Sequence, residues 1–155
     1  MVDVAPFLWF NNNAEQALEF YAGVFENSEI VGVTRMDATT IPNAAFLVGT
    51  IRIENLRITI LNGGPAFSLN EAFSLLVSCQ DQEEVDYYWS ALGSGGEYGP
   101  CGWLKDQFGV SWQIIPTLLG ELMGDSDSEK AARVHDAMMA MSKIDCAVLQ
   151  AAYDA

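Results

Sequence analysis

The sequence predicts an α+β fold built from two β-α-β-β-β modules with curled mixed sheets, followed by a helical C-terminal extension. The first observation is a repeat, because the aromatic pair Phe20-Tyr21 returns 67 positions later as Tyr87-Tyr88 in a similar helical pattern. The second is that each helical pattern follows a short apolar strand and precedes further strand-like runs. We therefore expect a single domain over residues 1–155, with modules at about 5–64 and 71–116 and an extension over 117–155.

The first module begins with the apolar strand Phe7–Phe10, which three asparagines typical of a turn follow. A helix is expected over Ala14–Phe25, because its apolar residues recur at three- and four-residue steps. Strands are then expected over Glu29–Met36, Ala45–Glu54 and Leu56–Leu61. The first module thus contains one helix and four strands.

The second module repeats this order. A strand over Ser74–Val77 leads to Asp81, a suitable N-cap, and to a helix over Gln82–Leu92. After a glycine-rich loop, a short strand is expected at Glu97-Tyr98. The last two strands are expected over Gly102–Lys105 and Val110–Ile115.

A four-residue turn with glycine at its end joins these last two strands in the prediction. In this register Lys105 pairs with Val110, and Trp103 pairs with Trp112 as a favourable cross-strand aromatic pair. Gln113 then points to the opposite face. If Gln113 faces a cavity, both tryptophans face the helices, so neither belongs to the predicted site.

The residues after Pro116 do not continue the repeat. A helical turn is expected over Thr117–Met123, and the capping box Ser126-x-x-Glu129 opens a second helix. The apolar stripe of that helix consists of Val134, Met138 and Met141. A final helix is expected over Asp145–Tyr153. These helices either cover the sheet or meet a partner chain.

The composition of the chain limits the partners that it can bind. The net charge is −14, from 21 acidic and 7 basic residues, so the surface repels phosphate backbones and anionic lipid. We expect no nucleic-acid partner, and we expect no membrane segment or secretory signal because the sequence has no long apolar run. The three scattered cysteines form no C-x-x-C pair, which favours a reduced cytoplasmic protein over zinc or redox chemistry.

Three segments resemble the signatures of PhnB-like proteins. Ala14–Tyr21 resembles A-E-x-A-x-x-F-Y, and Leu61–Pro65 resembles L-N-G-G-P. Gly102–Gln113 resembles the hairpin G-W-x-x-D-x-x-G-x-S-W-Q. The resemblance covers nearly the whole chain, from Pro6 to Tyr153, and the three motifs in this order are specific.

This resemblance implies the fold of the glyoxalase, bleomycin-resistance and dioxygenase group, also called the vicinal-oxygen-chelate group. Its paired modules curl around a cavity, and its members are commonly homodimers. The branch often carries the name 3-demethylubiquinone-9 3-methyltransferase, which implies methyl transfer to a quinone ring. The sequence gives that chemistry little support, because Pro65 removes a donor after Gly63-Gly64 and because Gly93–Gly96 follows a helix instead of a strand.

Enzymes of this fold group hold a divalent metal through His and Glu of the first and last strands of each module. In this sequence Asn62, Ser74 and Gln113 stand where ligands are expected, and Pro6–Leu8 offers none. Neutral amides are poor replacements for imidazole and carboxylate around a transition metal. We therefore predict no metal and no cofactor.

Other reactive residues have simpler interpretations. His135, the single histidine, suits a surface or half-buried helix position. Cys79 ends a strand and suits a small buried side chain, whereas Cys101 in a glycine-rich turn is the more reactive candidate. Arg57 lies on a strand expected to be half-buried, where pairing with an acid is favoured over anion capture.

The candidate pocket combines Trp9, Asn62, Ser74 and Gln113 at the mouth of a curled sheet. An apolar cavity with a few amides and hydroxyls is typical of a small-molecule site, although tryptophans at strand spacing also suit a core. We expect a cytoplasmic homodimer that binds a small planar or apolar molecule without a catalytic metal. The alternatives are an enzyme of the group (a lyase, a dioxygenase or the methyltransferase of the family name) and a structural or regulatory dimer without a ligand.

Overall fold

The computed structural model describes residues 1–35 and 48–155 and divides the chain into two compact units, Met1–Leu69 and Asn70–Ala155. Each unit is described by itself. The predicted strand end at Met36 and strand start at Ala45 lie outside the described residues.

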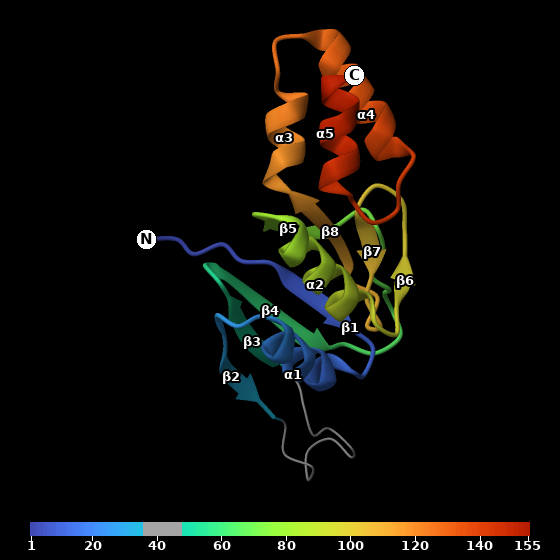
Figure 1. The fold of residues 1–155 in the computed structure, drawn as a ribbon. Coiled ribbons are helices and arrows are strands. Elements are labelled where there is room, and N and C mark those ends of the chain that lie inside the picture. Colours follow the sequence, from blue (N-terminus) through green and yellow to red (C-terminus); the bar gives the residue numbers. More distant parts are fainter. Residues whose placement is uncertain (36–47) are drawn as a thin grey trace. The chain divides into compact units, whose positions relative to one another are not determined.

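The first unit is a four-stranded sheet with one helix (Figure 1). Its elements are β1 (Phe7–Phe10), α1 (Ala14–Val24), β2 (Ser28–Thr34), β3 (Val48–Ile53) and β4 (Leu56–Asn62). The strand order is β1-β4-β3-β2, with β1 parallel to β4 and the other pairs antiparallel. Alternate residues are buried on one face of the sheet, namely Leu8, Phe10, Ile51, Ile53, Ile58 and Ile60. This face packs against α1, so the other face is more open.

The second unit repeats this topology. Its sheet contains β5 (Ser74–Cys79), β6 (Glu97–Tyr98), β7 (Trp103–Lys105) and β8 (Ser111–Pro116), in the order β5-β8-β7-β6, and α2 is Gln82–Gly93. The buried face consists of Leu75, Leu104, Trp112 and Ile114, and α2 supplies Val85, Trp89 and Leu92. Since the strand order matches that of the first unit element by element, the predicted α+β fold with two β-α-β-β-β modules is confirmed.

The predicted register of the β7–β8 hairpin is wrong by one residue. Lys105 pairs with Ser111 instead of Val110, so Trp103 pairs with Gln113. The cause is the buried carboxylate of Asp106, whose Oδ1 accepts from the backbone N–H of Val110 at 3.0 Å. The Asp106 N–H also donates to the Val110 carbonyl at 2.9 Å, which closes the turn one residue later than predicted. A shift of one residue exchanges the two faces of a strand.

Three helices complete the second unit: α3 (Thr117–Met123), α4 (Ser128–Met139) and α5 (Cys146–Asp154). They lie beside one another in Figure 1 and share an apolar core that includes Leu119, Val134, Ile144 and Leu149. Met138 and Met141 pack against this core, as the predicted stripe requires. The predicted cap at Ser126 is wrong, because the Asp127 carboxylate accepts from the N–H groups of Glu129 and Lys130.

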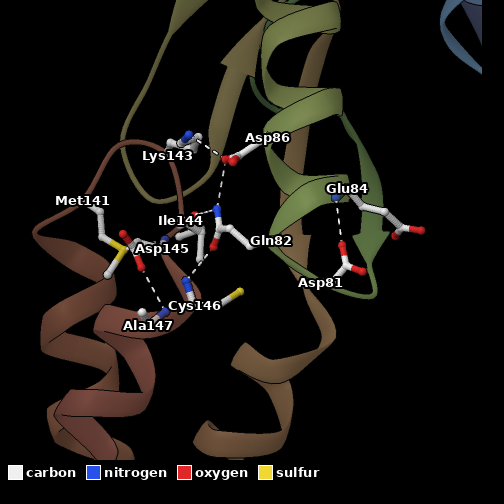
Figure 2. Close-up of polar contacts among 10 residues, drawn as sticks. All are labelled: Asp81, Gln82, Glu84, Asp86, Met141, Lys143, Ile144, Asp145, Cys146 and Ala147. Carbon is white, nitrogen blue, oxygen red and sulfur yellow. Dashed lines mark hydrogen bonds and ion pairs between the residues drawn. The ribbon is translucent and has the colours of Figure 1, made fainter.

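Polar contacts join the α4–α5 loop to α2 (Figure 2). The Gln82 side chain donates to the Ile144 carbonyl at 3.1 Å and accepts from the Cys146 N–H at 2.8 Å. Lys143 forms an ion pair with Asp86 at 2.6 Å. These contacts, here called the α2 latch, attach the C-terminal helices to the second module.

Candidate functional site

The open face of the second sheet carries a row of polar side chains. Ser74, Ser111, Lys105 and Glu97 are register partners on four adjacent strands, and therefore share the face that points away from α2. Gln113 lies on the same face and donates to the Ser74 hydroxyl at 2.9 Å. The structure thus brings together two of the four predicted site residues.

A cavity of about 360 Å³ opens on this face. Its lining includes Glu71, Glu97, Trp103, Lys105 and Ser111. This size lies at the lower end of the range for small-molecule sites.

Ser111 has an unusual environment in this cavity. Only 2% of the residue is exposed, and its Oγ has no hydrogen-bond partner in the part of the chain that the structure describes. Leaving a buried hydroxyl unpaired costs about 1–3 kcal/mol, so most such groups in proteins have partners.

An ion pair stands at the edge of the cavity. Lys105 Nζ lies 2.5 Å from Glu71 Oε1, and Glu97 is the cross-strand partner of Lys105. The hydrogen bond to Glu71 raises the pKa of Lys105, and the charge of Glu97 adds to this shift. The same hydrogen bond lowers the pKa of Glu71. The two pKa shifts both favour the charged forms of Lys105 and Glu71.

The sequence predicted that Trp103 faces the helices, and the structure places it on the open face instead. Since Trp103 pairs with Gln113, it lies on the open face, while Trp112 lies on the buried face and donates to Asp106 Oδ2 at 2.9 Å. An aspartate followed by glycine three residues later is typical of turns closed by side-chain to backbone hydrogen bonds. That signal in Asp106–Gly109 could have given the correct register.

Trp9 and Asn62 belong to the first unit, where both have structural contacts. Asn62 Oδ1 accepts from the Ala14 N–H at 2.9 Å and so caps the start of α1. The N-cap residue itself, Asn13, makes no side-chain capping hydrogen bond. Trp9 Nε1 donates to the Gly64 carbonyl at 2.9 Å, and its ring covers Gly63. The L-N-G-G-P segment therefore has a structural role in the first unit.

The remaining candidates are placed as follows. Cys79 is buried, and burial raises the pKa of its thiol to about 12. Cys101 is partly exposed and lies 3.6 Å from the Met139 sulfur. His135 is exposed on α4. Arg57 is exposed instead of half-buried, because it is the second residue of β4 and lies next to the β3–β4 hairpin turn.

The donor set at the predicted ligand positions does not fit a divalent metal. Asn62 caps a helix, and Ser74 and Gln113 are hydrogen-bonded to each other. Across residues 1–35 and 48–155, no group of three or more His, Cys, Asp or Glu side chains could hold a metal ion. In the same residues, no helix is long and apolar enough to cross a membrane.

The model of a protein family described as 3-demethylubiquinone-9 3-methyltransferase matches residues 2–115. The chain belongs to this family. A PhnB protein from Bacillus cereus named for the same methyltransferase is 28% identical, with a TM-score of 0.67 over 74% of this chain and 99% of that one. No curated protein sequence matches the chain.

Two further structures share the fold. Protein PA1353 from Pseudomonas aeruginosa is 18% identical, with a TM-score of 0.59 over 75% of this chain and 98% of that one. The fosfomycin resistance protein FosX from Listeria monocytogenes, in complex with Mn(II) and sulfate, is 20% identical, with a TM-score of 0.53 over 72% and 90% of the two chains. The chain thus has the vicinal-oxygen-chelate fold.

Proposed function

We propose that this PhnB-like protein binds a small planar or apolar molecule in the cavity on the open face of the second sheet. The observation that carries the proposal is the cavity of about 360 Å³ that Trp103 lines on the open face of this sheet. A tryptophan face can stack a planar ring, and a cavity of this size can hold a small molecule.

Ser74 and Gln113 border this proposed site, as register neighbours of Ser111 and Trp103. Their neutral side chains support binding without a catalytic metal. That Trp9 and Asn62 line a pocket stays a prediction.

The family name implies methyl transfer. The glycine segments of the chain give methyl transfer less support than the cavity gives ligand binding. In a nucleotide-binding loop the glycine backbone stays open to phosphate. Here Gly63 packs against the Trp9 ring, and the Gly64 carbonyl accepts from the Trp9 indole N–H. We therefore place enzymatic methyl transfer second.

We also propose that the protein is a cytoplasmic homodimer without a nucleic-acid partner. The dimer follows from the resemblance to PhnB-like proteins. The free thiols of Cys79, Cys101 and Cys146 fit a reducing compartment, and the charge of −14 disfavours phosphate backbones. Sedimentation of the purified protein tests the dimer directly, and a monomer at micromolar concentration would refute it.

A thermal-shift screen of planar aromatic compounds tests the binding function. A compound at 100 times its Kd stabilises the protein by about 2.7 kcal/mol. We expect Trp103→Ala to weaken the best compound about tenfold or more, since a stacking face is lost, while Tyr87→Ala on α2 leaves binding unchanged. Equal losses in both variants, or no stabilising compound at all, would contradict the proposal.

Metal analysis of the purified protein tests the second part of the proposal. We expect less than stoichiometric Mn, Fe, Ni and Zn, because the described donors at the family positions are neutral. A stoichiometric metal whose removal abolishes ligand binding would contradict a metal-free site.

A further inference from the structure

The charged side chains of the cavity have an excess of negative charge. Its lining contains two carboxylates, Glu71 and Glu97, and one ammonium group, Lys105. Their sum is −1. A ligand that enters the cavity therefore meets a net negative charge, even though a lysine is present.

Lys105 is poorly available to an anionic ligand. Its ammonium group already lies 2.5 Å from Glu71, and its side chain is only 31% exposed. An anion would have to displace Glu71 and would also approach Glu97, the cross-strand partner of Lys105. Both steps are unfavourable, because like charges repel and an ion pair is lost.

The other groups of the cavity suit a positive charge. Leu104 and Ser111, which also line the cavity, are uncharged and do not repel a cation. The Trp103 ring can stack a planar group, and its face also attracts a cation within about 6 Å.

We propose that the ligand of this cavity is a planar aromatic molecule that carries a single positive charge, with its ring on Trp103. This inference rests on the proposed function and specifies the class of ligand. It makes Glu71 and Glu97 the residues that determine charge selectivity.

Three probes with one ring system and different charges test the inference. They are 2-naphthylmethylamine, which is cationic, 2-naphthalenemethanol, which is neutral, and 2-naphthoate, which is anionic. Titration calorimetry with the full chain at low salt measures each Kd. We expect the cation to bind most tightly and the anion most weakly, with about fivefold between the cation and the neutral probe.

Variants assign the selectivity to its residues. Glu97→Gln is expected to weaken the cation about fivefold and to leave the neutral probe unchanged. Glu71→Gln is expected to weaken the cation and strengthen the anion, because it releases Lys105. Glu83→Gln, which makes the same charge change on the exposed side of α2, is the matched control and should alter no Kd. Thermal unfolding of each variant shows that it is folded.

The outcomes separate the inference from the function on which it rests. If the neutral or anionic probe binds most tightly and Trp103→Ala abolishes that binding, the cavity is a ligand site and the inference is wrong. If Glu83→Gln weakens the cation as much as Glu97→Gln does, the preference reflects the overall charge of the chain and the inference is also wrong. If no probe binds, both the inference and the proposed function fail.

Discussion

At the residue scale, Gly63 shows how one missing carbon determines the position of an aromatic ring. A Cβ atom at this position would lie 2.2 Å from Cε2 of Trp9. The ring also bonds the Gly64 carbonyl, and Gly64 has a φ of +86°, which favours glycine. The two glycines therefore allow the strand end to fold closely over Trp9.

We predict that Gly63→Ala destabilises the protein by about 1–3 kcal/mol, because the new methyl group and the Trp9 ring cannot both keep their places. Chemical denaturation measures the free energy of unfolding, and near-ultraviolet circular dichroism reports the displaced indole. Gly23→Ala, at an exposed α1 position where a Cβ meets nothing within 4 Å, is the control. It should stabilise by about 0.5–1 kcal/mol, and equal losses in the two variants would refute the explanation.

At the element scale, single side chains set how strands and helices join. Asp106 determines the register of the β7–β8 hairpin through its bonds to the Phe108 and Val110 N–H groups and the Trp112 indole. Gln82 has a comparable role for helices, since it bonds two backbone groups of the α4–α5 connection. These buried or half-buried contacts connect elements that are far apart along the chain or lie on either side of a turn.

We predict that Gln82→Ala loosens the C-terminal helices without unfolding the second sheet. The Cys146 N–H loses its acceptor at the start of α5, which costs about 1–2 kcal/mol locally. Hydrogen exchange should become faster at the first turn of α5 and stay unchanged in β8. Gln80→Ala, an exposed neighbour before α2, is the control. Faster exchange throughout the second unit would mean that the latch stabilises the whole unit.

At the scale of the whole molecule, charge is the dominant feature. The 21 acidic residues outnumber the 7 basic ones threefold, so one-to-one ion pairing would still leave a surplus of 14 negative charges. Exposed ion pairs such as Lys143–Asp86 contribute little to stability, because water and salt screen them. Repulsion among the surplus acids therefore outweighs attraction at low ionic strength.

We predict that Tm rises when salt is raised from about 10 mM to 200 mM at pH 7, because shorter Debye lengths screen the repulsion. A gain of about 1 kcal/mol corresponds to about 2–4 °C for a chain of this size. Differential scanning calorimetry in sodium chloride and choline chloride measures the effect. An equal rise of Tm in both salts would indicate screening, whereas a fall in Tm would show that ion pairs dominate.

The sequence predicted the fold well, because its signals are local. Apolar steps in Ala14–Phe25 and Gln82–Leu92 and the alternation along the strands depend only on neighbouring residues. The predicted helices therefore match α1 and α2 within a residue or two. The duplicated topology followed from the repeat of these signals.

The candidate site was only partly predictable. Strand position and family motif place Ser74 and Gln113 on one face, and in the structure their side chains are hydrogen-bonded to each other. Trp103 was missed, since its face depends on a turn that a buried aspartate lengthens by one residue. Ser111 was missed because an unpaired hydroxyl is visible only when all its neighbours are known.

By itself, the sequence determined the α+β class, the two modules, the family and the acidic surface, since each of these depends on composition or on residues close together along the chain. The tertiary structure decided which side chains meet. It turned Asn62 into a cap for α1 and placed Trp103 beside Lys105 and Ser111 at one cavity. Such contacts depend on register and on burial between distant segments, and no local pattern encodes them.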